Sequence, residues 1–142
     1  MKWWLSMGKI DSKQLTDKIQ NYRDNGKSCS QSVLTGICTT VDCKLSEEEL
    51  LSLGKGFSGG IGGTFDEGTC GALTGAIMAL GLIYPDDQKI NVALSKQLLK
   101  FFQDEFTTLQ CGKLTHNGED KTICDPCCAF VGEKFAQLYN EI

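Results

Sequence analysis

Residues 54–75 read GKGFSGGIGGTFDEGTCGALTG, a glycine-dense loop that runs into a cysteine and then into an apolar segment. Glycine costs folding entropy, so this density indicates backbone at positive φ or in close approach to another group. Cys70 opens the apolar run from Ala72 to Tyr84, which predicts a helix that begins at this cysteine. Unpaired N–H groups and the positive end of the helix dipole stabilise a thiolate at such a position. We therefore expect Cys70 to be the reactive thiol.

Outward from this stretch, the apolar residues recur at helical spacing and indicate no strand pair. Hydroxyl or carboxyl caps mark several helix starts, most clearly Ser46 followed by three glutamates. The fold is expected to be all-α, a compact bundle of five to six helices joined by short connections. The expected helices cover residues 11–24, 28 to about 39, 46–53, 71–84, 90–110 and about 126–139.

The chain of 142 residues suits one domain, 1–142, with residues 1–10 as a loosely ordered N-terminal extension and 25–135 as the core. A net charge of −4 argues against a nucleic-acid footprint. The longest apolar run, 72–84, is too short to span a bilayer, and the N-terminus lacks a signal-peptide pattern. Eight cysteines in a chain of this length fall below the density of a disulfide scaffold. We expect a cytoplasmic protein whose thiols do metal or redox chemistry.

The other cysteines fall at distinct positions. Cys29 follows the Ser28 cap and shares the electrostatic setting of Cys70. Cys111 falls at the end of the 90–110 helix, where the dipole disfavours a thiolate, so it suits a resolving or metal-bound role. Cys124 and Cys127 have the CxxC spacing of redox and zinc pairs alike.

Three further features favour structural interpretations. Cys38 lies within a helix, where a buried thiol behaves as a small hydrophobe, and Cys43 falls in a connector. Residues 54–59 match G-x-G-x-x-G, but they follow a helix rather than a strand, which argues against a dinucleotide site. His116 reads as a solvated loop residue, and Gly71 with Gly75 as a small-residue face for close helix packing.

Taken together, the pattern over residues 25–135 resembles the family of redox-active proteins named for the cysteine signature C…GCAxxG…C…C. The matching residues are Cys29 with Ser30-Gln31-Ser32-Val33, Phe57 with the glycines to Gly63, Cys70-Gly71-Ala72-Leu73-Thr74-Gly75, Cys111 with Lys113-Leu114-Thr115, and Cys127 or Cys128 ahead of Phe130-Val131. Thr69 stands where the family label has glycine, and Cys38, Cys43 and Cys124 are additional. The resemblance implies a redox role in bacteria and archaea of anaerobic habit, often near transporter genes.

The resemblance places the four family cysteines at Cys29, Cys70, Cys111 and Cys127, with Cys128 as a rival for the last. Our first hypothesis is thiol–disulfide exchange or electron transfer with a redox partner protein or a small thiol. Cys70 would attack, Cys29 would be its partner, and Cys111 with Cys127 would form a second pair. The glycine loop would admit the partner or contact a cofactor, through Gly59, Gly60, Gly62, Gly63 and Gly71.

Two alternatives stay open. The same cysteines, with Cys124 and Cys128, would hold zinc or an iron–sulfur cluster, a different use of thiolates gathered from separate helices. Otherwise the thiols are buried and inert, and the glycine loop serves packing alone.

Overall fold

The computed structural model describes residues 8–142, which form seven α-helices. The helices are α1 (Ser12–Asp24), α2 (Cys29–Val41), α3 (Glu47–Gly54), α4 (Gly71–Ile83), α5 (Gln88–Phe106), α6 (Cys111–Thr115) and α7 (Cys124–Asn140), with a 3₁₀ turn, η2 (Lys55–Phe57), after α3. Within 8–142 there is no β-strand, only an isolated antiparallel bridge between Thr69 and Gln110. The predicted all-α class is confirmed.

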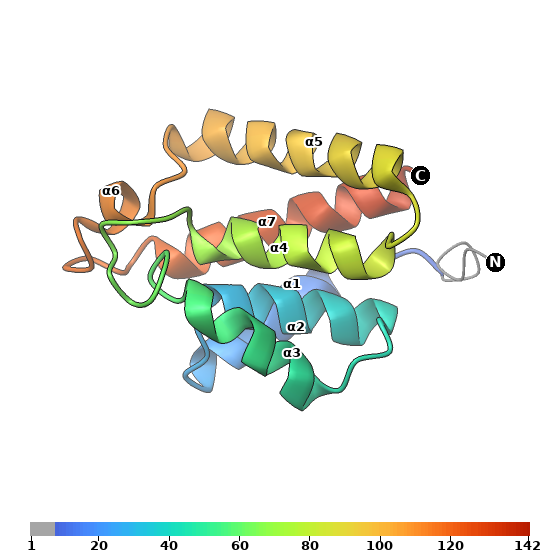
Figure 1. Cartoon of the computed structure of the whole chain (residues 1–142), viewed down its shortest axis with the longest axis horizontal. Helices are drawn as coiled ribbons and strands as arrows, with labels where there is room; N and C mark the ends of the chain where they lie inside the picture. Colours follow the sequence, from blue (N-terminus) through green and yellow to red (C-terminus); the bar gives the residue numbers. More distant parts are fainter. Residues whose placement is uncertain (1–7) are drawn as a thin grey trace.

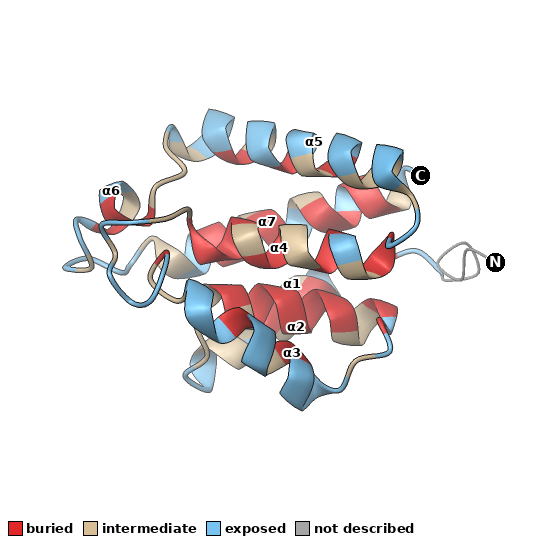
Figure 2. Ribbon diagram, viewed as in Figure 1, coloured by how far each residue is buried: buried red, intermediate tan, exposed pale blue. Residues whose placement is uncertain are grey.

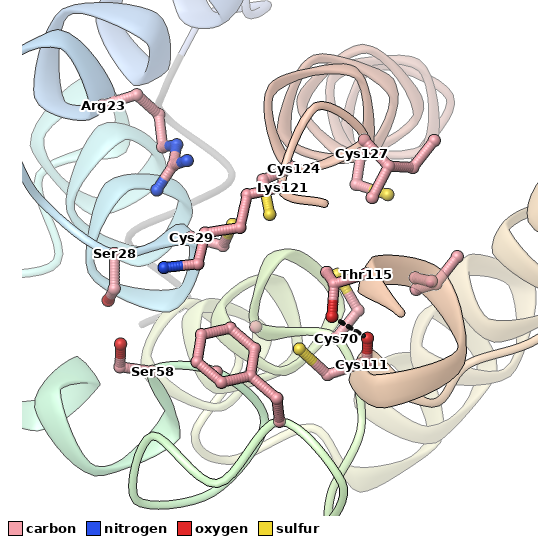
Figure 3. Close-up of a pocket in the computed structure, with 15 residues that line it drawn as sticks. Arg23, Ser28, Cys29, Ser58, Cys70, Cys111, Thr115, Lys121, Cys124 and Cys127 are labelled. Atoms are coloured by element: carbon pink, nitrogen blue, oxygen red, sulfur yellow. Dashed lines mark hydrogen bonds between the residues drawn. The ribbon is translucent and has the colours of Figure 1, made fainter. Parts of the chain in front are cut away.

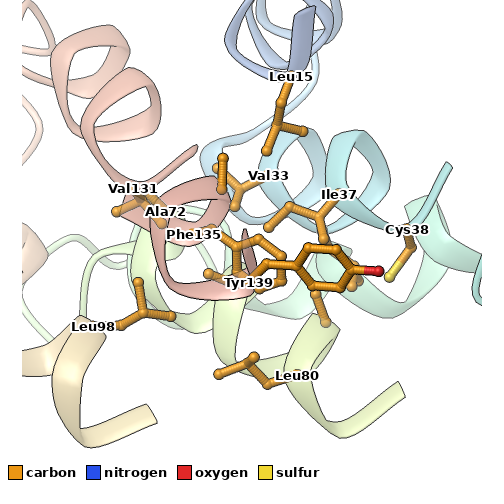
Figure 4. Close-up of a cluster of buried hydrophobic side chains, with 14 of the residues drawn as sticks. Leu15, Val33, Ile37, Cys38, Ala72, Leu80, Leu98, Val131, Phe135 and Tyr139 are labelled. Carbon is orange, nitrogen blue, oxygen red and sulfur yellow. The ribbon is translucent and has the colours of Figure 1, made fainter. Parts of the chain in front are cut away.

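Two helices form the centre of the bundle. Helix α2 packs on α1, α3 and α4, and α7 packs on α1, α4 and α5 (Figure 1). The faces that these helices turn inward are buried, whereas α3 and α5 each keep one side in solvent (Figure 2). Leu15, Ile37, Ala72, Leu80 and Phe135 lie in the shared core (Figure 4).

Local capping fixes where the first three helices start. Asp11 accepts a hydrogen bond from the Gln14 amide at the start of α1. Ser28 begins α2 and Ser46 begins α3, each in a complete capping box with the residue three positions later. These three starts agree with the sequence prediction.

Gly71 and Gly75 let α4 approach α2 closely. A Cβ atom at Gly71 would lie 2.9 Å from the Ser30 nitrogen, and one at Gly75 would lie 2.7 Å from the Ser30 carbonyl oxygen. Real Cβ atoms do not reach such distances, so the predicted small-residue packing face is confirmed. This contact holds the N-terminal ends of α2 and α4 together.

The helix expected over 90–110 is shorter, and Cys111 does not end it. Helix α5 stops at Phe106, because Thr107 adopts a left-handed conformation with φ 66°. The chain then runs extended beside the glycine loop, and Cys111 becomes the first residue of α6. This added five-residue helix is why the described chain has seven helices rather than five or six.

The expected N-terminal extension falls partly outside the described residues, because 1–7 are not among them. Ile10, within the stretch expected to be loose, is buried, and its amide donates to Asn140 Oδ1 at 2.7 Å. The Asn140 amide group in turn donates to the Ile10 carbonyl at 2.9 Å. The approach to α1 is thus fastened to the end of α7.

No helix within 8–142 combines the length and the apolar character needed to cross a bilayer.

Candidate functional site

A cavity of about 120 Å³ lies at the end of the bundle where α2, α4, α6 and α7 begin. Figure 3 shows the side chains that surround it. Five of its lining residues are cysteines: Cys29, Cys70, Cys111, Cys124 and Cys127. All four residues expected to carry the redox chemistry therefore line one cavity, together with Cys124, which the sequence offered as a metal ligand.

The helix starts place the sulfurs. Cys29 is the first residue of α2, directly after its Ser28 cap, and Cys70 is the N-cap residue of α4. Cys124 begins α7, and Cys127 lies at the end of its first turn. The positive ends of three helix dipoles, those of α2, α4 and α7, therefore meet at the thiols. This convergence favours negative charge in the cavity.

A pair of main-chain hydrogen bonds fixes Cys111 relative to Cys70. The Cys70 amide donates to the Leu109 carbonyl at 2.7 Å, and the Cys111 amide donates to the Gly68 carbonyl at 3.1 Å. These bonds flank the bridge between Thr69 and Gln110. The end of the glycine loop and the start of α6 are therefore joined at the rim of the cavity.

The deepest thiol pair is Cys70 with Cys127. Their side chains hydrogen-bond, and both residues are buried. The bond to Cys127, and then burial, raise the pKa of Cys70 well above its ordinary value. The helix start at Cys70 was predicted correctly, but its expected low pKa was wrong in this reduced state. The hydrogen bond from Cys70 to the Cys127 sulfur raises the pKa of Cys70 by more than the dipole of α4 lowers it.

A second pair joins Cys29 to Cys124, and both residues are partly exposed. The bond from the Cys124 thiol lowers the pKa of Cys29, but a bond to Cys128 and burial outweigh it, so the net shift is upward. The bond to Cys29, followed by burial, raises the pKa of Cys124. Cys128 therefore takes part through Cys29, although it does not line the cavity.

These contacts differ from the pairing expected from sequence. Cys29 was expected to partner Cys70, and Cys111 to partner Cys127. Instead α7 supplies the hydrogen-bond partners of both Cys29 and Cys70. Cys111 stands apart from these pairs: burial, followed by the nearby Cys70 and Cys124, raises the pKa of its thiol.

Two cations at the cavity were not anticipated from sequence. The Arg23 Nε atom donates to Asp125 Oδ1 at 2.8 Å, and its Nη1 donates to the Lys27 carbonyl at 2.9 Å. Arg23 thereby links α1 to the start of α7 and lowers the pKa of Cys124 by its charge. The Lys121 ammonium lies 4.9 Å from the centre of the Phe65 ring. In the sequence, Arg23 looks like an ordinary last-turn cation, and only its place six residues before Cys29 hints at this role.

Of the five glycines expected at a cofactor or partner, Gly59 and Gly71 line the cavity. The structure does not bring Gly60, Gly62 and Gly63 to it. The amides of Gly62 and Gly63 donate to carbonyls within the loop, at 2.9 Å and 2.8 Å. These hydrogen bonds stabilise the fold of the loop itself.

Three further residues for which the sequence favoured a structural role lie outside the cavity. Cys38 and Cys43 are buried outside the cavity, and His116 is exposed in the loop after α6. Among residues 8–142, no group of three or more His, Cys, Asp and Glu side chains is arranged so that it could hold a metal ion.

Comparison with known proteins agrees with this site. Searches of curated proteins and of solved structures found no match. A family model described as "Putative redox-active protein (C_GCAxxG_C_C)" matches residues 27–142, which include all eight cysteines. The match covers most of the chain and every thiol of the cavity, and the chain belongs to this family of cysteine-signature redox proteins.

Proposed function

We propose that the cavity is a dithiol–disulfide centre. Its pair Cys29 and Cys124 reduces a small disulfide and is itself oxidised to a disulfide. The observation that carries the proposal is the presence of five cysteines around one cavity, with two hydrogen-bonded thiol pairs among them. Two thiols in direct contact need little movement to form a disulfide. Cys29 and Cys124 are the partly exposed members, so an external disulfide reaches them first.

In the first step, the Cys29 thiolate attacks one sulfur of the external disulfide. A mixed disulfide forms and one small thiolate leaves. The Cys124 sulfur then attacks the Cys29 sulfur of the mixed disulfide, the second small thiolate leaves, and a bond between Cys29 and Cys124 remains. The protein gives up two electrons and the two thiol protons, which the two small thiols receive.

Three features of the cavity support this role. The Cys124 thiol donates its hydrogen bond to Cys29 and so stabilises the Cys29 anion. The N-terminus of α2 adds unpaired amide groups beside that sulfur. Arg23 adds a positive charge on the same side of the cavity. Together these groups select Cys29 as the attacking sulfur of the pair.

The buried pair of Cys70 and Cys127 would supply a second pair of electrons. A Cys127 thiolate would attack Cys29 in the bond between Cys29 and Cys124, form a mixed disulfide with Cys29 and release the Cys124 thiolate. The Cys70 sulfur would then attack Cys127, release Cys29 and leave a disulfide between Cys70 and Cys127, with two electrons and two protons passed to the outer pair. Cys70 and Cys29 are near enough for the charge of one to raise the pKa of the other, which supports such exchange within the cavity.

The test uses protein purified without oxygen, with zinc and iron measured and free thiols counted before and after exposure to cystamine. The expected result is metal-free protein that loses thiols in pairs. Tryptic fragment 28–44 should become linked to fragment 122–134, which contains Cys124. Cys124→Ser should stop this link and leave a mixed disulfide on Cys29, whereas Cys43→Ser, outside the cavity, should leave it unchanged. Near-stoichiometric metal that Cys70→Ser removes would overturn the proposal in favour of a metal or cluster site. Metal-free protein whose cavity thiols stay free in cystamine would overturn it in favour of inert thiols.

A further inference from the structure

The end of α2 carries two cysteines in a helix-terminating turn, away from the cavity. Asp42 follows the last helical residue and adopts a left-handed conformation with φ 59°. The amide of Cys43 then donates to the carbonyl of Cys38 at 3.1 Å. The amide of Asp42 also donates to the Cys38 carbonyl. The turn thus has the left-handed residue and the six-to-one hydrogen bond of a Schellman motif.

In this motif the side chains of the two bonded residues pack against each other, and an apolar contact is usual. Here both residues are cysteines, and the two thiols are hydrogen-bond partners. Cys38 is 1% exposed and Cys43 is 8% exposed. The direct main-chain bond holds the two α carbons within the short span that a disulfide needs.

The pair is independent of the thiols in the cavity. Neither Cys38 nor Cys43 lines it, and Cys38 lies nine residues after Cys29 along the same helix, roughly 14 Å at the usual rise per residue. The family signature does not use these two cysteines. Exchange with the cavity is therefore excluded by distance, and the pair needs an oxidant of its own.

Tyr139 closes the other side of the pair. Burial, and then the nearby Cys43 sulfur, raise the pKa of Tyr139. Figure 4 shows its hydroxyl pointing toward Cys38. The turn after α2 therefore contacts the last turns of α7, and a bond within the turn would fix the connector that leads to α3.

We propose that Cys38 and Cys43 are a second redox site, which forms a reversible disulfide at the C-terminal end of α2 with a small-molecule disulfide as the oxidant. The Cys43 sulfur, the more exposed of the two, attacks the small disulfide and releases one small thiol. The Cys38 sulfur then attacks the Cys43 sulfur of the mixed disulfide and releases the second. Two electrons and two protons pass from the protein to the small molecule.

The chain offers a direct test, because cleavage before aspartate separates the two cysteines. The cut before Asp42 yields fragment 24–41, with Cys29 and Cys38, and fragment 42–65, with Cys43 alone. Reduced, full-length protein is incubated with excess cystamine, the remaining thiols are alkylated, and the fragments are examined by mass spectrometry. We expect fragmentation to assign a bond between Cys38 and Cys43 that joins the two fragments. In the wild-type chain Cys29 should also carry fragment 120–124, which contains Cys124, whereas in Cys29→Ser the two fragments alone should be joined, at a mass two hydrogen atoms below their sum.

Two variants that remove a cysteine of the pair, and one that removes Cys29 from the same fragment, test the assignment. Cys38→Ser and Cys43→Ser should each abolish the link, while Cys29→Ser should preserve it. Because the wild-type chain itself gives the readout, the result does not depend on whether the variants fold. Alkylation of both Cys38 and Cys43 after oxidation, in protein whose cavity thiols have become linked, would overturn the inference. A link that persists in Cys38→Ser would do the same. A different outcome is a bond between Cys38 and Cys43 in protein whose cavity thiols stay free. That result would support the second site and overturn only the proposed function.

Discussion

The Cys70 thiol at the start of α4 hydrogen-bonds the Cys127 thiol in the first turn of α7, between residues that are 6% and 0% exposed. This bond is the largest cause of the raised pKa of Cys70. The proton of Cys70 is therefore held by a neighbouring sulfur rather than released to the dipole of its own helix. The reactivity of Cys70 depends on α7 as much as on the glycine loop.

Replacement of Cys127 by alanine should lower the pKa of Cys70, because it removes the partner that holds the proton. The measurement is the pH dependence of Cys70 alkylation, read on tryptic fragment 56–89, in which Cys70 is the only cysteine. The profile should move to lower pH in Cys127→Ala. It should stay in place in Cys43→Ala, a matched loss of a buried thiol outside the cavity. An unmoved profile in Cys127→Ala would show that burial alone controls Cys70.

Arg23 should set the rate at which the exposed pair reacts. Its charge lowers the pKa of Cys124 and lies beside Cys29, and Asp125 holds the guanidinium in place. Arg23→Gln should slow cystamine reduction near neutral pH by roughly threefold to tenfold, because less of the pair is ionised. The reaction should recover as the pH is raised, since thiolate then forms without the cation.

The control for Arg23 lies on the same helix. Lys13→Gln removes the same charge and breaks the exposed ion pair of Lys13 with Asp17, which is 2.7 Å long. Such surface pairs contribute about 0–1 kcal/mol, so stability and rate should hardly change. Equal slowing in both variants would show that the net charge of α1, rather than the position of Arg23, controls the rate.

The reduced protein should lose stability as the pH rises above about 8.5, the ordinary range of thiol ionisation. The pKa values of Cys29, Cys70 and Cys124 are all raised in the folded state. Above the ordinary thiol pKa, unfolding therefore releases protons that the folded chain still holds. Each such thiol removes about 1.4 kcal/mol of unfolding free energy per pH unit, until the pH passes its folded-state pKa.

Chemical denaturation at pH 7.5, 8.5 and 9.5 tests this. The midpoint of the reduced protein should fall little between pH 7.5 and 8.5 and more steeply between pH 8.5 and 9.5. The cystamine-oxidised form, whose paired thiols no longer titrate, should show a smaller fall. Equal midpoints for the reduced protein at all three pH values would contradict raised folded-state pKa values.

The sequence was sufficient wherever the deciding interactions are local. The caps at Asp11, Ser28 and Ser46 act within three residues, and each marks a real helix start. The family cysteines could be placed near helix starts for the same reason. Only Cys111 was misplaced, because the main-chain bond from its amide to Gly68 crosses to a distant part of the chain.

The pairing of the thiols could not be read from the sequence, because it depends on how the helices pack. The sequence suggested that close packing at Gly71 would bring a thiol from another helix toward Cys70. The helix that packs there is α2, yet the thiol that hydrogen-bonds Cys70 comes from α7. Arg23 escaped notice because its role rests on Asp125, which lies 102 residues away.

Gly75 should be the position in α4 least tolerant of a methyl group. Alanine is about 1 kcal/mol better than glycine within a helix, so Gly→Ala would stabilise α4 if there were room. At Gly75 a Cβ atom would lie 2.7 Å from the Ser30 carbonyl oxygen and 3.2 Å from the Leu34 nitrogen, both backbone atoms of α2. Gly75→Ala should therefore lower the unfolding free energy by about 1–3 kcal/mol, the usual effect of overpacking.

Gly81, on the same helix, is the matched control. A Cβ atom there would meet only the Asn91 side chain at 3.9 Å, and the residue is exposed. Gly81→Ala should leave stability unchanged or raise it by up to about 1 kcal/mol, as helix propensity alone dictates. Denaturant unfolding of both variants gives the comparison. Because α2 and α4 carry Cys29 and Cys70, Gly75→Ala should also disturb thiol pairing in the cavity, whereas Gly81→Ala should not. If both alanines stabilise the protein equally, the close contact of α2 with α4 does not hold the cavity together.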